Sequence, residues 1–111
     1  MAALLTCLSS YDAGHTPDPD VERSAVKSTL GLLKAKAPGR SVEVRVPPYA
    51  AVQAVEGVQH RRGTPSAVVE ADAATWLRLA AGVLTWSDAL RSGALRASGE
   101  RSDLSGYLPL A

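Results

Sequence analysis

Residues 72–99 read DAATWLRLAAGVLTWSDALRSGALRASG, and this stretch decides the fold because its pattern changes from helix to helix to strand at clear signals. Asp72 is a suitable N-cap for the first helix, since its carboxylate can accept a free N–H group of the first turn. Gly82 can end that helix in the left-handed conformation that favours glycine. The apolar side chains recur at helical spacing and predict one large apolar face. They are Ala73, Trp76, Leu77, Ala80 and, beyond Gly82, Leu84.

A second helix is predicted to begin at Thr85, which has the spacing of a capping box to Asp88, and to end at Gly93. After Gly93 the pattern alternates with a period of two until Gly99, which is typical of a strand. The apolar side chains that this second helix is expected to bury are Trp86, Ala89 and Leu90. Both tryptophans of the chain therefore lie on consecutive apolar faces.

The first third of the chain predicts two helices of different length. Residues 2–8 are apolar enough for a short helix, and residues 9–19 read as a linker rich in turn formers, with disorder as an expectation for part of 1–19. The next helix begins near Asp18 or Asp20 and ends before Pro38. Its apolar stripe predicts a packing helix and consists of Val26, Leu30, Leu33 and Ala37.

The middle of the chain predicts three strands, at residues 41–46, 49–55 and 66–71. The first alternates cleanly between valine and polar residues, as expected for a sheet covered on one face. The pair Pro47-Pro48 cannot donate to a ladder, so it marks a bend or an edge. Short connections favour antiparallel pairing, and helices gathered on one face would give an α+β two-layer sandwich.

Composition and charge restrict the class of protein. A chain of 111 residues with 46% hydrophobic and 21% charged residues has the composition of one globular domain. The formal net charge of +1 provides no overall field to attract nucleic acid or an anionic membrane. The single cysteine, Cys7, cannot form an internal disulfide and fits a reducing compartment. No stretch approaches the roughly 18 apolar residues of a membrane span. We therefore expect a cytoplasmic protein without nucleic-acid partners or stable membrane insertion.

The residues that could carry chemistry are few and scattered. His15, His60 and Cys7 are the candidate nitrogen and sulfur ligands for a metal, and they lie far apart in the sequence. Cys7 has no neighbouring base in its apolar segment and reads as a packing residue. The glycines occur singly, so they do not form a phosphate-binding loop. We expect a protein that is not an enzyme and holds neither a metal nor a cofactor.

Two features leave a functional and a structural interpretation open. His60-Arg61-Arg62 can form an anion site for a carboxylate, phosphate or lipid headgroup, or it can be a solvated loop whose arginines pair with surface carboxylates. Trp76 and Trp86 can line an apolar ligand site, or they can fill a core that contains no phenylalanine.

The order of these signals resembles the C-terminal half of the sterol carrier protein 2 superfamily. The matching features are an acidic cap, an aromatic residue, Leu79, Gly82 and Leu84, a second helix opened by tryptophan, and then Gly93-Ala94-Leu95 and Gly99. Upstream, VRVPPYAAVQAVEG and HRRGTPSAVVEAD resemble the short actinobacterial proteins called sterol carrier family proteins. The resemblance covers residues 20–111 and implies one α+β domain, a two-layer sandwich with a mainly antiparallel sheet and helices on one face.

The resemblance also implies a function, the non-catalytic binding or transfer of an apolar or amphiphilic small molecule such as a fatty acid or acyl-CoA. The residues expected to line the cavity are Val52, Val69, Trp76, Leu77, Ala80, Leu84, Trp86 and Leu90. An anionic end of the ligand would lie at His60, Arg61 and Arg62. Larger members close their cavity with a C-terminal helix that Pro109 limits here, so a shallow groove or a filled core is the alternative. In that case the chain would be a ligand-free interaction module or a homodimer with an apolar strip covered by its partner.

Overall fold

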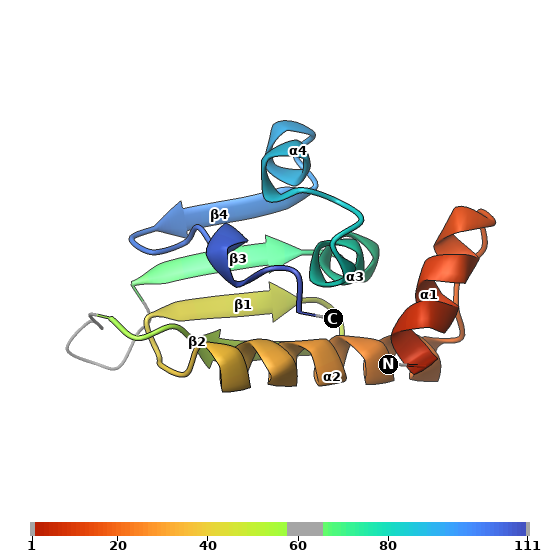
Figure 1. The fold of residues 1–111 in the computed structure, drawn as a ribbon, viewed down its shortest axis with the longest axis horizontal. Coiled ribbons are helices and arrows are strands. Elements are labelled where there is room, and N and C mark those ends of the chain that lie inside the picture. Colours follow the sequence, from red (N-terminus) through yellow and green to blue (C-terminus); the bar gives the residue numbers. More distant parts are fainter. Residues whose placement is uncertain (1, 58–65, 111) are drawn as a thin grey trace.

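The structure is a computed structural model, and it describes residues 2–57 and 66–110. Four helices and four strands follow one another along these residues (Figure 1). The helices are α1 (Ala2–Asp12), α2 (Pro19–Lys36), α3 (Ala73–Ala81) and α4 (Trp86–Arg91). The strands are β1 (Val42–Val46), β2 (Ala50–Ala54), β3 (Ala67–Ala71) and β4 (Leu95–Gly99), and a single 3-10 turn follows at Ser105–Tyr107.

The strands form one sheet in the order β2-β1-β3-β4. The β1–β2 and β3–β4 pairs are antiparallel, whereas β1 and β3 are parallel. The expectation of antiparallel pairing is therefore wrong for the central pair. The reason is topological, because β2 reverses the direction of β1 and β3 reverses it again on the other side of β1. The sheet is mixed but mostly antiparallel, and the predicted α+β class is confirmed.

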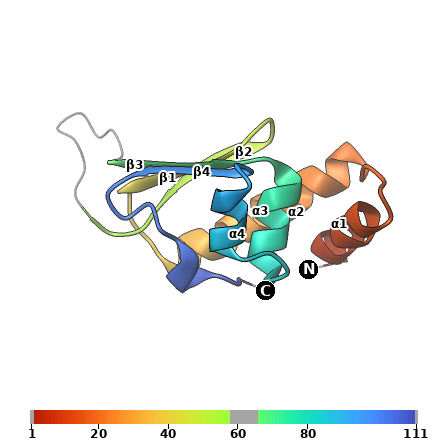
Figure 2. The ribbon, with the colours of Figure 1, turned by 90° about the horizontal axis from the view of Figure 1, so that it is seen from above.

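The helices lie on one face of the sheet, as predicted (Figure 2). The inward positions alternate along the strands, and the buried ones are Val42, Val44, Val46, Ala54, Ala67, Val69, Ala71 and Leu95. The outward positions are mostly polar, with Ala51 and Val68 as the apolar ones, and Arg96 pairs there with Glu70 of the neighbouring strand at 2.8 Å. One covered face and one solvated face explain the alternation seen in the sequence.

The helix signals of residues 72–99 are confirmed at atomic detail. The Asp72 carboxylate accepts a hydrogen bond from the backbone N–H of Thr75 at 2.8 Å, and Gly82 ends α3 with a φ of 80°. Thr85 caps α4 by accepting from the N–H of Asp88 at 3.1 Å. The predicted burial of Leu90 is wrong, since its side chain is 42% exposed. The six-residue α4 packs through Trp86 and Ala89, and Leu90 lies at the outer edge of that stripe.

The N-terminal helix is longer than predicted, because residues 9–12 continue α1 instead of starting the linker. Tyr11 provides the physical reason. Its hydroxyl donates a hydrogen bond to Glu22 of α2, so a tertiary contact overrides the turn preference of the two serines before it. Leu4 and Cys7 of α1 are buried in the same core as α2 and α3.

Candidate functional site

The residues expected to line a ligand cavity separate into three groups. Val69, Trp76, Leu77 and Ala80 are fully buried in the core between the sheet and the helices. Val52 is half-buried on the inner face of β2, and Leu90 is exposed on α4. Leu84 and Trp86 lie together in a surface groove. The predicted anion site of His60, Arg61 and Arg62 lies outside the described residues.

Trp76 is one of the four buried residues, and its polar group has a partner inside the core. Its indole is 0% exposed, and its Nε1–H donates to the Thr29 hydroxyl of α2 at 2.8 Å. That hydroxyl in turn donates to the backbone carbonyl of Ala25 at 2.8 Å or of Val26 at 3.0 Å. The polar end of the indole is therefore satisfied inside the protein, and its ring fills the space between α2 and α3.

A groove of about 260 Å³ lies where the end of α3, the start of α4 and the C-terminal segment meet, and we call it the α3–α4 groove. Its lining consists of Leu79, Gly82, Leu84, Thr85, Trp86, Ser105, Leu108 and Pro109. None of these side chains is charged. The polar side-chain groups of the lining are the hydroxyls of Thr85 and Ser105 and the indole N–H of Trp86, and the Thr85 hydroxyl already caps α4.

The local sequence explains how the groove is built. The backbone N–H of Leu110 donates to the carbonyl of Ala80 at 2.8 Å, which fixes the C-terminal segment against the end of α3. A Cβ at Gly82 would lie 3.1 Å from the Pro109 ring, so glycine permits both the left-handed turn and the close crossing. Sequence reasoning left Leu79, Leu108 and Pro109 out of the expected lining. The apolar Leu108 and Leu110 in the tail were the available signal.

The size of the groove restricts what it can hold. Sites for drug-sized molecules usually measure about 300–1,000 Å³ and surround most of the ligand. A volume of about 260 Å³ fits part of an amphiphile, such as a segment of alkyl chain, with the remainder outside. A larger depression of about 480 Å³ at the end of β3 is less suited to an apolar ligand, since Glu70, Asp72 and Arg96 line it.

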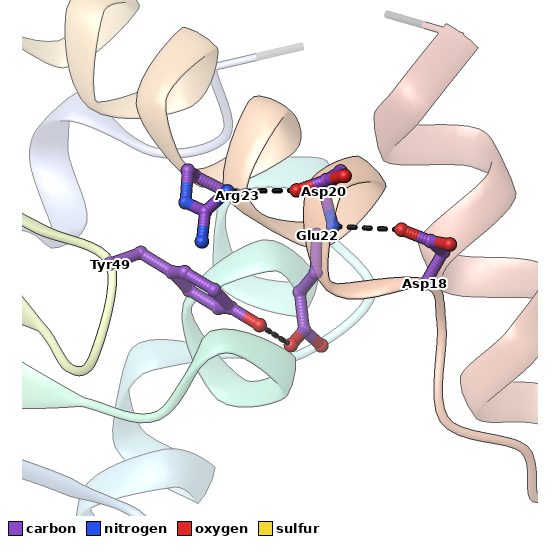
Figure 3. A network of polar contacts seen from close by, with 5 residues as sticks. All are labelled: Asp18, Asp20, Glu22, Arg23 and Tyr49. Carbon is purple, nitrogen blue, oxygen red and sulfur yellow. Dashed lines mark hydrogen bonds and ion pairs between the residues drawn. The ribbon is translucent and has the colours of Figure 1, made fainter.

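A depression of about 380 Å³ with a mixed polar and apolar lining lies between the end of α1 and the rest of the domain. Among its lining residues, the Tyr49 hydroxyl donates to Glu22 Oε1 at 2.6 Å, and the Tyr11 hydroxyl donates to the other oxygen. Figure 3 shows Glu22 meeting the hydroxyl of Tyr49, while Arg23 pairs with Asp20 at 2.9 Å. The carboxylate thus ties α1 and the β1–β2 turn to α2.

The electrostatics of this cluster disfavour nucleophilic and acid–base chemistry. Burial and the hydrogen bond to Glu22 raise the pKa of Tyr11, and the hydrogen bond to Glu22 raises the pKa of Tyr49. Burial, followed by the Glu22 charge, raises the pKa of the Cys7 thiol. These groups therefore stay protonated near neutral pH, and a protonated thiol is a poor nucleophile. Within residues 2–57 and 66–110, His, Cys, Asp and Glu side chains do not gather in groups of three or more that could hold a metal ion.

Residues 18–110 match the family model described as bacterial SCP ortholog. The chain belongs to this family of bacterial SCP orthologs. The membership confirms the resemblance to the sterol carrier protein 2 superfamily. The matched residues include the whole α3–α4 groove, whereas α1 precedes them. Among the described helices of this bacterial SCP ortholog, each is too short or too polar to cross a membrane.

Solved structures also resemble the chain. The crystal structure of sterol carrier protein 2 like 2 from Aedes aegypti is 20% identical to it, with a TM-score of 0.46. That similarity covers 78% of this chain and 95% of the mosquito protein. Curated proteins do not match the sequence.

Proposed function

We propose that this chain binds the apolar part of an amphiphilic small molecule in the α3–α4 groove, without catalysing a reaction on it. A fatty acid or an acyl-CoA is the ligand class that we favour, and the cytoplasm is the compartment. The observation that carries the proposal is the uncharged lining of the groove, in which Leu84 is half-buried and Trp86 is 9% exposed. Membership of the SCP family supports it.

The energetics of the groove predict a dependence on chain length. Each methylene group removed from water contributes about 0.8 kcal/mol, so affinity should rise with alkyl length until the groove is full. Beyond that length further methylenes stay in water and add little. The headgroup would remain outside the groove, and His60-Arg61-Arg62 as its anchor stays a prediction from the sequence.

The test is isothermal titration calorimetry with a series of saturated fatty acids below their critical micelle concentrations. We expect Leu84→Ala to weaken binding about tenfold, since it removes apolar contact area from the groove wall. Val83→Ala is the matched control, because Val83 is the adjacent residue, is 67% exposed and does not line the groove. Equal affinities for the two variants would place the ligand elsewhere and refute the groove as its site.

A second candidate function is an interaction module with no small ligand. Val83 is 67% exposed and lies between two groove residues, and Leu90 is 42% exposed and lies four residues after Trp86 on α4. A second copy or another protein that covers them would remove this apolar surface from water. Sedimentation velocity distinguishes this candidate, because a dimer that dissociates in Leu90→Ser but persists in Leu5→Ser would support it. Leu5 is a suitable control, since it is 64% exposed on the distant α1.

A further inference from the structure

Helix α1 is an addition to the SCP domain. It ends at Asp12, before the residues that match the family, and it stands against α2 and α3 at one end of the molecule (Figure 1). Its apolar side is buried through Leu4 and Cys7, and Leu8 packs against the same core. The helix therefore covers apolar surface that the matched domain would otherwise expose.

The polar attachment of α1 is concentrated at one residue. Among the described residues, Tyr11 makes the side-chain hydrogen bond that joins α1 to the rest of the chain, with Glu22 as acceptor. The Arg78 guanidinium of α3 lies 5.3 Å from the centre of the same ring. The polar contacts that hold α1 on α2 and α3 therefore come from one side chain at the end of the helix.

Several properties make α1 a unit that can open by itself. Isolated helices shorter than about 12–15 residues are marginally stable in water, and α1 has 11 residues. Residues 15–18, which connect it to α2, have no helix or strand structure. A helix joined to its domain through an irregular linker can open locally at a lower free energy than global unfolding requires. The core beneath, centred on Trp76, does not depend on α1 for its hydrogen bonds.

The surface under α1 is suited to hydrocarbon. Helix α3 reads AATWLRLAA and buries six of its nine residues, five of which are apolar. Leu4 and Leu8 now supply aliphatic groups against this core. An alkyl chain offers the same methyl and methylene contacts without the backbone.

We propose that α1 is a displaceable cover and that the apolar face of α2 and α3 beneath it is a second binding surface for the alkyl chain of an amphiphile. The inference rests on the proposed function only for the choice of ligand class. In the absence of ligand α1 covers this surface, and an alkyl chain that binds there displaces the helix. Tyr11 sets how readily the replacement occurs.

Cys7 reports the opening directly, because it is the single cysteine of the chain and is 0% exposed. The experiment measures the rate of its alkylation by iodoacetamide, by mass spectrometry at fixed pH, with and without laurate. Laurate should accelerate alkylation several-fold. Tyr11→Phe should accelerate it about tenfold without laurate, as expected when one hydrogen bond to a charged acceptor is lost. Tyr49→Phe is the matched control, since it removes the other hydrogen bond to Glu22 without touching α1, and its rate should stay within about twofold of the original.

Two further results decide the inference. Local opening predicts that alkylation depends weakly on low urea concentrations, whereas a dependence as steep as that of global unfolding overturns the cover. Laurate binding is followed in parallel by calorimetry. Binding with unchanged or slower alkylation overturns the second surface and leaves the groove as the site. Absence of binding overturns the proposed function and the ligand part of this inference, and the urea dependence still decides whether α1 opens.

Discussion

At the scale of single residues, the Trp76 indole requires a hydrogen-bond acceptor inside the core. Its N–H is buried and depends on the Thr29 hydroxyl, which lies 47 positions away in the sequence. Thr29→Val keeps the shape of the side chain but leaves the indole N–H without an acceptor. We expect the free energy of unfolding to fall by about 1–3 kcal/mol, as measured by urea denaturation.

The control for this substitution is Thr29→Ser, which keeps the hydroxyl and loses one methyl group, at a cost of about 1 kcal/mol. Thr29→Val is also made in a Trp76→Phe background, where no indole N–H needs an acceptor. The cost of Thr29→Val should be smaller there. An equal cost in both backgrounds would show that the hydrogen bond contributes nothing to stability.

The two tryptophans also show what sequence reasoning could not separate. Both lie on apolar faces of predicted helices, so a ligand-lining and a core-filling interpretation remained open for each. The structure places Trp76 in the core and Trp86 at the edge of the α3–α4 groove. The difference depends on Thr29 and on Pro109, two long-range neighbours that helical periodicity does not reveal.

At the scale of elements, the β3–β4 pair tests the role of a glycine at a strand end. Gly99 has a φ of 91°, and a Cβ there would lie 2.2 Å from the Ser66 carbonyl oxygen. Gly93 has a similar φ of 79°, but a Cβ at this position would have no neighbouring atom within 4 Å among the described residues. Both alanine variants therefore share a left-handed backbone, and only Gly99→Ala adds a clash with the neighbouring strand.

We expect Gly93→Ala to lower the free energy of unfolding by about 1–2 kcal/mol, the cost of a left-handed residue with a side chain. Gly99→Ala should lose about 1–3 kcal/mol more, because the backbone around Ser66 and Ala67 must move. Thermal and urea unfolding of the two variants measure the difference. Similar losses in the two variants would mean that the backbone around Ser66 and Ala67 can move without a further loss of stability.

Local signals account for most of the elements that were predicted correctly. Asp72, Gly82 and Thr85 act within one turn of their own helix ends, so the sequence indicates them directly. The parallel β1–β3 pairing and the last turn of α1 depend on contacts between distant segments. The first follows from the position of β2 on the other side of β1, and the second from the bond between Tyr11 and Glu22.

At the scale of the whole molecule, the fold class and family could be predicted, but the shape of the candidate site could not. The order of helix caps, apolar faces and alternating strands is enough to indicate an α+β sandwich of the SCP type. The groove arises where the C-terminal segment crosses α3, through the bond between Leu110 and Ala80. That crossing is a tertiary event, and the sequence offers only the apolar character of the tail as a sign of it.

The attachment of α1 to the domain makes the stability of the whole molecule dependent on alkaline pH. The pKa values of Tyr11 and Tyr49 are raised above the ordinary value of 10.0, and that of Cys7 is raised above 9.0. The folded state therefore holds protons that the unfolded state releases as the pH rises past these ordinary values. The stability from these groups is fully present at neutral pH and is lost progressively above about pH 9.

We expect the free energy of unfolding, measured by urea titration at a series of pH values, to decline above this range. Each group can contribute a slope of at most about 1.4 kcal/mol per pH unit, because the unfolded state then binds one proton fewer. The Tyr11→Phe, Tyr49→Phe double variant should be less stable at neutral pH but should decline less steeply. Tyr107→Phe is the control, because the hydroxyls bonded to Glu22 are those of Tyr11 and Tyr49. Removing the Tyr107 hydroxyl should leave the slope unchanged. If the double variant and the original protein showed the same slope, the hydroxyls of Tyr11 and Tyr49 would not be the cause of the pH dependence of stability.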